Sequence, residues 1–308
     1  MINKQLEQNK RELKKRLKEV NLDLSIYEKA PRKYIRINPR NPIRVLTLEK
    51  ELLKNYSLKT HFKKTAIKGI YESSNNNIGG WIKDKKNIFF NENYFIQDFA
   101  SVICVNEFGL KSNKTFLETC AARGFKTILA SDMLKGKLKI TALDINLEKY
   151  KIMIGFFKKF GIKAKTKLID FTKFKGKKDD FVLVDAPCSS EGMNVTYDSN
   201  LKKDVGGLDE VLKYSQKDIY DFAELQSKLL QNGFNHLKKN GTWIYATCTL
   251  NKIENEEVVG RFLYENQNAK VIKINMDKYK TKSTQSDLGV RIIPDKTKGF
   301  YFVKIIKK

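Results

Sequence analysis

Two stretches of this sequence each place a cysteine directly after an apolar run. The first cysteine, Cys188, lies in Asp185-Ala186-Pro187-Cys188-Ser189 and follows the run 180–184. The second, Cys248, lies in Thr247-Cys248-Thr249 and follows the run 241–246. Runs of this length and composition predict buried strands, and ligands of open α/β sheets bind beyond the carboxyl ends of their strands. The sequence therefore predicts an α/β enzyme in which two thiols face one crevice and one acts as a nucleophile.

These residues alone do not show which of the two thiols is the nucleophile. The attacking species is the thiolate, so the nucleophile needs a lowered pKa or a nearby base. A free cysteine is more often a buried, inert side chain, and we assign Cys104 and Cys120 to that class for nucleophilic work. The cysteines form no C-x-x-C pair, and the two histidines are not spaced with them as zinc ligands would be. We therefore expect no metal site. A disulfide framework is not expected in a basic, unsecreted chain of this size, so we expect reduced thiols.

From residue 114 onward the sequence alternates strand-like and helix-like segments, which is typical of a doubly wound, Rossmann-like sheet. We expect strands at residues 115–119, 138–143, 165–169, 180–184, 241–246 and 299–305. We expect helices at residues 148–160, 219–237 and 254–266, with one more that starts near Cys120. The residues 238–241 predict a turn between a helix and the strand that follows it.

Acidic residues follow three of the predicted strands, namely Asp144, Asp170 and Asp185. Asp144 comes about twenty residues after the first turn, where an acid can accept the ribose hydroxyls of a nucleoside. Asp170 could meet an adenine amino group, and the helix near Cys120 offers backbone N–H groups to a carboxylate. Each aspartate alone would more often be a cap, and the first turn lacks a G-x-G-x-x-G pattern. Together the three acids favour an adenosine with an amino-acid tail, S-adenosylmethionine.

Residues 1–108 are expected to form a separate basic region, with the boundary between residues 95 and 112. Residues 2–20 predict an amphipathic helix, either packed with a solvated basic face or in contact with RNA, and both can hold. Residues 34–37 predict a strand in a basic stretch with an embedded aromatic side chain. We expect RNA contacts there from Lys33, Arg36, Asn38 and Arg40. Further helices are expected at 46–56 and 94–105, and a strand at 87–90.

The charge of the chain points to a polyanionic partner. Its 308 residues include 60 lysines and arginines against 35 aspartates and glutamates, a formal net charge of +25. An excess of this size predicts nucleic acid as the simplest partner. No run approaches the roughly 18 apolar residues of a membrane span, and the lysine-rich N-terminus lacks the apolar part of a secretory signal. We therefore expect a monomeric, cytoplasmic protein that binds RNA and no membrane.

The two cysteine motifs together resemble those of the Sun-type (RsmB/NOL/Sun) RNA (cytosine-5)-methyltransferases. Residues 188–193 and 247–251 are most similar to the bacterial RsmF-like, ribosomal-RNA branch. Weaker similarities are found at Tyr34-Ile35-Arg36-Ile37-Asn38, at 95–101 and at Gly299-Phe300-Tyr301. The resemblance implies a Rossmann-like S-adenosylmethionine-dependent methyltransferase sheet in residues 109–308, with a smaller basic N-terminal α+β region in residues 1–108.

The resemblance also implies an activity, the methylation of C5 of a cytosine in RNA, with ribosomal RNA favoured and transfer RNA as the other candidate. It assigns the attack on C6 to Cys248, hydrogen bonds with the base to Asp185, and help in product release to Cys188. It places the cofactor against a loop and three acids, namely Cys120, Ala121, Ala122, Arg123, Gly124, Phe125, Lys126, Asp144, Asp170 and Asp185.

The cofactor loop departs from the family pattern. Arg123 stands where the family has a proline, Phe125 where it has a glycine, and farther on Lys298 replaces an aspartate. If that glycine is needed for a positive φ or a close approach, Phe125 would strain or crowd the loop. The alternative function is therefore an RNA-binding or ribosome-assembly factor that keeps the fold and binds the cofactor weakly. A DNA cytosine methyltransferase is disfavoured, because those enzymes use a Pro-Cys nucleophile without the Thr-Cys motif.

Overall fold

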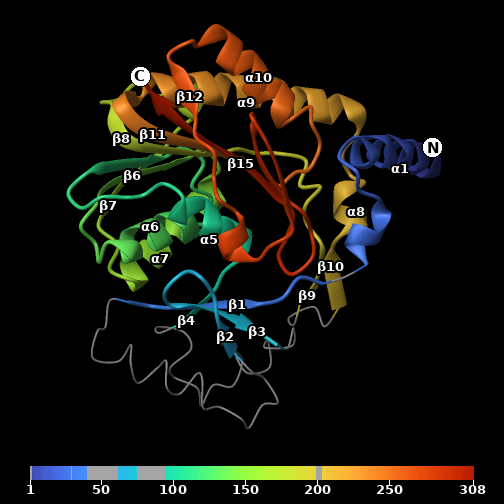
Figure 1. Ribbon diagram of the computed structural model, residues 1–308, viewed down its shortest axis with the longest axis horizontal. Coiled ribbons are helices and arrows are strands. Elements are labelled where there is room, and N and C mark those ends of the chain that lie inside the picture. The colour runs from blue at the N-terminus through green and yellow to red at the C-terminus, as the bar shows by residue number, and fades with distance from the viewer. Residues whose placement is uncertain (1, 29, 40–61, 75–93, 199–202) are drawn as a thin grey trace.

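A nine-stranded sheet forms the centre of the computed structural model, which describes residues 2–28, 30–39, 62–74, 94–198 and 203–308 (Figure 1). The strand order is β13-β14-β15-β11-β8-β5-β6-β7, and β12 pairs with β15. The strands are β5 (Thr115–Glu118), β6 (Lys139–Asp144), β7 (Ala164–Leu168), β8 (Asp179–Asp185), β11 (Leu237–Thr247), β12 (Ala269–Val271), β13 (Ser283–Ser286), β14 (Gly289–Ile292) and β15 (Phe300–Lys307). The strands from β7 to β11 run parallel, and those beyond them are antiparallel.

Helices pack on both faces of this sheet. Within the described residues, the helices and helical turns are α1 (Ile2–Glu19), η1 (Leu24–Tyr27), α5 (Phe99–Asn106), α6 (Phe125–Met133), α7 (Leu147–Lys159), η3 (Phe171–Lys173), α8 (Leu208–Val211), α9 (Gln216–Asn235), α10 (Glu256–Glu265) and η4 (Asp277–Tyr279). Figure 1 shows α5, α6 and α7 on one side of the sheet and α9 and α10 on the other.

Burial alternates along the central strands, as the period of two in a strand requires. In β8, Phe181 and Leu183 belong to the core beneath α5 and α6. Val182 and Val184 belong to the core beneath α9 and α10. Because both faces are covered, the strand is apolar throughout its middle, which is why the sequence predicted it as a continuous apolar run.

A smaller antiparallel sheet is built from the N-terminal part of the chain. Its order is β2-β3-β1-β4, with β1 (Tyr34–Ile37), β2 (Phe62–Lys64), β3 (Ile70–Ser73) and β4 (Tyr94–Ile96). Tyr34 stacks on Phe99 of α5 with ring centroids 4.6 Å apart, which joins this sheet to the large one. A hairpin of β9 (Val195–Asp198) and β10 (Lys203–Gly206) follows the loop after β8.

The strand predicted at 34–37 and the strands and helices of the large sheet are confirmed, with shifts at their ends. The single helix predicted at 94–105 is wrong, because Asp98 has an extended backbone and caps a helix that starts at Phe99, after β4. The helix placed near Cys120 begins instead at Phe125. The turn at 238–241 lies within β11, whose pairing shifts register there. The segments predicted at 46–56 and 87–90 lie outside the described residues.

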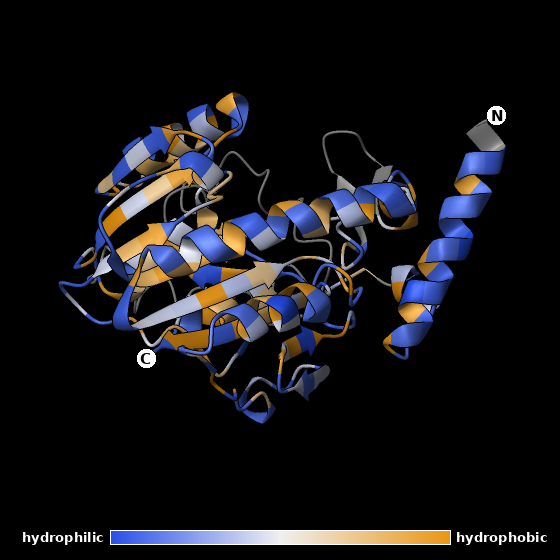
Figure 2. Cartoon of the chain, turned by 90° about the horizontal axis from the view of Figure 1, so that it is seen from above, coloured by the Kyte–Doolittle hydropathy of each residue, from blue (hydrophilic) through white to orange (hydrophobic). Residues whose placement is uncertain are grey.

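Helix α1 packs at the end of the molecule, and Figure 2 shows it as largely hydrophilic along its length. Its Leu13 and Leu17 are buried in a cluster with Leu212 and Leu250. Its basic residues Arg11, Lys14, Lys15 and Lys18 are exposed. The packed helix with a solvated basic face is therefore present, and this face stays available to RNA. In the described part of the chain, no helix is both long and apolar enough to cross a membrane.

Candidate active site

The structure brings the two predicted thiols together at the carboxyl edge of the sheet. Cys188 follows β8 and Cys248 follows β11, and these parallel strands are neighbours that pair Asp185 with Ala246. The two Sγ atoms lie 3.2 Å apart. Cys248 Sγ also lies 3.5 Å from the hydroxyl oxygen of Ser190.

The surroundings of the two thiols make them chemically different. Donation of the Cys188 S–H to Cys248 lowers the pKa of Cys248 and raises the pKa of Cys188 well above its ordinary value, and burial raises the latter further. Cys188 is buried, whereas Cys248 is half-buried. Burial raises the pKa of Cys120 to about 12, and it raises the pKa of Cys104 as well. Cys248 is therefore the cysteine that most readily becomes a thiolate.

A buried carboxyl, Glu254, holds the two cysteine loops against each other. It accepts hydrogen bonds from the Ser189 backbone N–H at 3.0 Å, from Asn251 Nδ2 at 2.8 Å and from Gln226 Nε2 at 2.9 Å. Burial raises the pKa of Glu254. The sequence placed Glu254 only at the start of a predicted helix, because nothing in the sequence shows that it bridges both loops.

The loop after Cys188 approaches Cys248 so closely that it requires glycine. The Gly192 N–H donates to the carbonyl oxygen of Cys248 at 2.8 Å. A Cβ on Gly192 would lie 2.2 Å from the carbonyl oxygen of Gly299. Gly192 thus fixes the distance between the two cysteine loops.

An ion pair joins the expected cofactor loop to the end of β8. Lys126, in the first turn of α6, places Nζ 2.5 Å from the carboxylate of Asp185. Burial opposes the charge on Lys126, but attraction to Asp185 prevails and raises its pKa. The same ammonium lies 5.7 Å from the ring centroid of Phe300. Asp185 therefore presents a carboxylate with a fixed cation beside the two thiols.

The loop between β5 and α6 is bound to Asp144. The Asp144 carboxylate accepts hydrogen bonds from the Ala122 N–H at 2.6 Å and from the Asn146 N–H at 2.7 Å. The turn uses positive φ angles of 49° at Ala122 and 79° at Gly124. Phe125 is the first residue of α6, and its ring lies 5.2 Å from that of Phe156. Backbone strain at Phe125 is therefore absent, because the left-handed conformations fall on its neighbours.

The remaining residues expected at the cofactor are placed as follows. Asp170 follows β7 and caps η3, accepting from the Thr172 N–H at 2.9 Å and from the Thr172 hydroxyl at 2.7 Å. Because β6 and β7 are parallel neighbours, Asp144 and Asp170 lie at the same sheet edge. Arg123 is exposed on the loop. These acids and the loop N–H groups have the donor and acceptor chemistry that a nucleoside with an amino-acid tail requires.

Of the four residues expected to contact RNA, three are described, and one of these is buried. Arg36 is buried, ion-paired with Asp132, with its guanidinium 4.2 Å from the Phe95 ring centroid. Its expected contact with RNA is therefore corrected to a structural role, because Phe95 of β4 and Asp132 of α6 enclose its guanidinium. Lys33 and Asn38 are half-buried, and burial followed by repulsion from Lys298 lowers the pKa of Lys33. Arg40 lies outside the described residues.

An N-terminal contact with the loop after β8 was missed by the sequence reasoning. Arg16 of α1 forms a buried ion pair with Glu191, with Nε 2.7 Å from Oε1. The Tyr27 hydroxyl donates to the Glu191 carbonyl oxygen at 2.8 Å. The partners are too far apart in sequence for any local pattern to reveal the pair.

Solved structures define the class of fold to which this chain belongs. A methyltransferase homolog protein from Pyrococcus horikoshii superposes with a TM-score of 0.74 at 20% identity, covering 92% of this chain and 89% of that one. NSun6 from Pyrococcus horikoshii, solved with SFG, gives a TM-score of 0.74 at 17% identity and covers 97% of each chain. The chain has the α/β fold of the S-adenosylmethionine-dependent methyltransferases.

Sequence comparisons identify the family within that class. The family described as 16S rRNA methyltransferase RsmB/F matches residues 107–306. The probable ribosomal RNA small subunit methyltransferase B of Bacillus subtilis is 31% identical over 234 residues, covering 71% of this chain and 49% of that protein. The methyltransferase B of an Enterobacter species is 28% identical over 221 residues, covering 69% and 47%. The chain belongs to the RsmB/F methyltransferase family, and it spans about half the length of these relatives.

Proposed function

We propose that this protein transfers a methyl group from S-adenosylmethionine to C5 of a cytosine in RNA, through a covalent bond between Cys248 and the base. The observation that supports this most directly is the Cys248 thiol of lowered pKa, 3.2 Å from Cys188 Sγ, at the sheet edge that also carries Asp185. Small-subunit ribosomal RNA is the favoured substrate, because the matched relatives bear that name. The RsmF-like branch stays a prediction, since the matched family covers both B and F proteins.

The cysteines activate the base by reversible addition. The Cys248 thiolate forms a bond to C6, and the electron pair of the C5–C6 double bond then makes C5 nucleophilic. S-adenosylmethionine, when bound, supplies the methyl group as part of a sulfonium. The Asp185 carboxylate accepts a hydrogen bond from the pyrimidine amino group, and from N3 when N3 carries a proton, with Lys126 holding its orientation. Once C5 carries the methyl group, water takes the C5 proton, and the electron pair of the C5–H bond reforms the C5–C6 double bond as the C–S bond breaks. The Cys188 S–H donates to the departing Cys248 sulfur and so assists its release.

The cofactor is proposed to lie against the loop of residues 120–126 and the strand-end acids. In this proposal, Asp144 binds the ribose hydroxyls and Asp170 binds the adenine. The N–H groups at the start of α6 bind the carboxylate tail. The RNA is proposed to cross residues 1–108, with contacts from Lys33, Asn38, Arg40 and the exposed lysines of α1. The target base must leave any stack to reach the thiols.

Covalent trapping tests this proposal. Small-subunit ribosomal RNA transcribed with 5-fluorocytidine is incubated with S-adenosylmethionine and the wild type, Cys248→Ala, Cys188→Ala or Cys104→Ala. Fluorine at C5 prevents proton loss, so a denaturation-resistant complex should form with the wild type and with Cys104→Ala, the buried-thiol control. Loss of the complex only in Cys248→Ala is the expected result. Loss only in Cys188→Ala would reverse the assignment of the nucleophile.

The assembly-factor alternative is supported only by Arg123 and Phe125 in the cofactor loop. S-adenosylmethionine that binds the folded state raises the thermal midpoint in proportion to the logarithm of its concentration. A concentration-dependent rise is expected here. No rise, together with no trapped complex on any RNA, would favour the assembly factor.

A further inference from the structure

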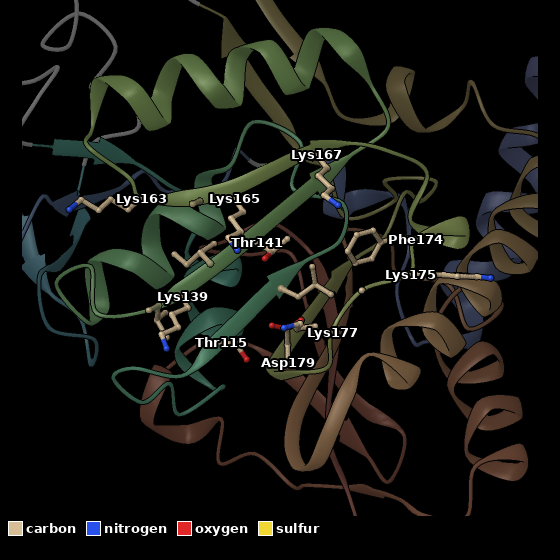
Figure 3. A pocket seen from close by; sticks show the side chains of 15 residues that line it. Thr115, Lys139, Thr141, Lys163, Lys165, Lys167, Phe174, Lys175, Lys177 and Asp179 are labelled. Carbon is tan, nitrogen blue, oxygen red and sulfur yellow. The ribbon is translucent and has the colours of Figure 1, made fainter.

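A groove lined by lysines lies on the large sheet, away from the two thiols (Figure 3). It encloses about 800 Å³, and the starts of four parallel strands line it, at Thr115, Lys139, Ala164 and Asp179. The thiols follow the opposite, carboxyl ends of such strands. Among the described residues that line it, one is an acid, Asp179, and six are lysines, named here the lysine groove: Lys139, Lys163, Lys165, Lys167, Lys175 and Lys177.

The groove exists because one face of the sheet lacks a covering helix over β6 and β7. On the opposite face, Ala142 of β6 packs against Met153 and Phe157 of α7. Between β7 and β8 the chain passes only through η3 and residues 174–178, which have no helix. Parallel sheets normally bury both faces under helices. The face over β6 and β7 is left to charged side chains instead.

Every second residue of β6 and β7 points to this face of the sheet, and most of these residues are polar. In β6, exposed Lys139 and half-buried Thr141 alternate with buried Ile140. In β7, Lys165 and Lys167 are both exposed and share one face of the strand. The sequence thus places cations at the positions that would be apolar beneath a helix.

The wall formed by residues 174–177 is held firmly. The buried ring of Phe174 stacks on His236 with centroids 5.2 Å apart, and Lys167 Nζ lies 5.4 Å from the Phe174 centroid. The Gly176 N–H donates to His236 Nε2 at 3.1 Å. A Cβ on Gly176 would lie 2.6 Å from the Phe174 ring, so this turn packs tightly on the ring. Lys175 and Lys177 therefore project from a fixed backbone.

The charge of the groove is largely unbalanced in the described parts of the chain, because six lysines line it against one acid, Asp179. Within those parts, none of the six lysines forms an ion pair with a carboxylate. Like charges gathered on one surface repel one another, and a polyanion that bridges them removes this repulsion and releases its own counterions.

We propose that the lysine groove binds the phosphodiester backbone of the RNA substrate, as a second contact beyond the cytosine site. This inference rests on the proposed RNA methylation. The 7 residues of β8 span the sheet from the groove edge to the thiols, a length of roughly 20 Å at the usual rise of a strand. Only an RNA that extends several nucleotides beyond the target base can therefore reach both sites.

A charge-neutralised triple variant tests the groove. Lys139→Gln/Lys165→Gln/Lys167→Gln removes three of its cations, and the matched control Lys149→Gln/Lys151→Gln/Lys158→Gln removes three exposed lysines of α7 on the other face. Affinity for a fluorescent 40-nucleotide RNA hairpin is measured by anisotropy from low to high salt. The groove variant should lose about tenfold in affinity, and its slope of log K against log salt should fall by about 2 to 3. The corresponding Lys→Arg triple variant should bind like the wild type.

Methylation kinetics complete the test. On small-subunit ribosomal RNA the groove variant should raise KM with kcat unchanged, and on a fragment of about ten nucleotides around the modified cytosine it should match the wild type. Equal losses in the groove and α7 variants, or unchanged RNA affinity in the groove variant, would overturn the inference, the latter pointing to an acidic protein partner. If neither the wild type nor any variant forms a trapped complex while the selective loss of binding persists, the proposed function fails, and the groove binds RNA that is not a methylation substrate. Thermal midpoints equal to that of the wild type verify that the variants are folded.

Discussion

Cys248 and Cys188 are the same chemical group, and a single hydrogen bond makes one of them the better nucleophile. The Cys188 S–H stabilises a thiolate on Cys248, which lowers the pKa of Cys248 and raises that of Cys188. Lys126 adds a favourable charge and Asp185 an unfavourable one. Reactivity is thus a property of the pair, and neither cysteine motif predicts it when considered alone.

Alkylation of Cys248 by iodoacetamide should follow this hydrogen bond. In the wild type the rate should rise with pH and reach half its maximum below the ordinary thiol pKa of about 8.5. Cys188→Ala removes the donor, so the midpoint should move upward, and a thiol pKa that is higher by one slows alkylation at neutral pH about tenfold. Site-resolved mass spectrometry measures the rates. The Cys104→Ala control should keep the wild-type midpoint, and an unchanged midpoint in Cys188→Ala would contradict this account.

Glu118, at the end of β5, should make stability depend on pH. Burial raises its pKa to about 7, although the Thr127 hydroxyl donates to it. Because the folded-state pKa exceeds that of the unfolded chain, the contribution of Glu118 is fully present below about pH 4.5 and is lost as pH rises through about 7. The free energy of unfolding of Glu118→Gln, relative to that of the wild type, should therefore be higher at pH 8 than at pH 4 by as much as ~3 kcal/mol.

Denaturant unfolding at several pH values between 4 and 8 measures this difference. Glu148→Gln, an exposed position at the start of α7, is the control and should change the free energy of unfolding by less than about 1 kcal/mol at each pH. A Glu118→Gln difference that stays constant with pH would show that the carboxyl does not titrate in this window.

Among the elements, the loop from Cys120 to Phe125 depends most on one glycine. Gly124 adopts a φ of 79°, and a Cβ there would lie 2.5 Å from the Phe157 ring. Gly124→Ala should destabilise the fold by about 1–3 kcal/mol, from backbone strain and overpacking. Gly155→Ala is the matched control, because Gly155 lies in α7 with nothing within 4 Å of its Cβ, and it should stabilise the helix by about 0.5–1 kcal/mol. The unfolding midpoint of each variant is compared with that of the wild type. Shifts of the same sign in both variants would contradict the special role of Gly124.

The sequence predicted the parallel core well because each strand there carries its own signal. The run 180–184 is apolar on both faces and ends at Pro187, so its length and its boundary are both local properties. The helix expected at 94–105 failed because apolar residues of a short strand and a short helix share one pattern, and only the capping by Asp98 separates them. Local sequence patterns predict an element correctly when its own residues set its boundaries. They fail when contacts with neighbouring segments set those boundaries.

The site was predicted unevenly for the same physical reason. Cys188, Cys248 and Asp185 end neighbouring strands, so topology alone brings them to one edge. Arg36 reads in the sequence as a basic residue of a surface strand, and only the tertiary structure encloses it with Asp132. Contacts between distant segments, such as Glu254 with Ser189, leave no periodic trace in the sequence.

Over the whole molecule, the N-terminal helix is coupled to the catalytic loop through buried charge. Arg16 donates to Glu191 at 2.7 Å and to Gln216 Oε1 at 2.6 Å, so one guanidinium joins α1, the loop after β8 and the start of α9. Glu191 lies between Ser190, whose hydroxyl faces Cys248, and Gly192, which donates to the Cys248 carbonyl. The position of α1 should therefore affect both stability and catalysis.

Arg16→Met should reveal this coupling. The variant leaves Glu191 buried without its cation, which costs about 3–5 kcal/mol in the free energy of unfolding, and it should slow covalent trapping because the loop beside Cys248 loses its anchor. Lys15→Met is the control, since its pair with Glu12 is at the surface and is worth at most about 1 kcal/mol. Arg16→Met/Glu191→Leu removes both charges and should recover most of the stability, but not the trapping rate, because the α1 anchor is still absent. Recovery of both would mean that α1 only stabilises the fold, whereas no loss in Arg16→Met would mean that the helix and the loop are independent.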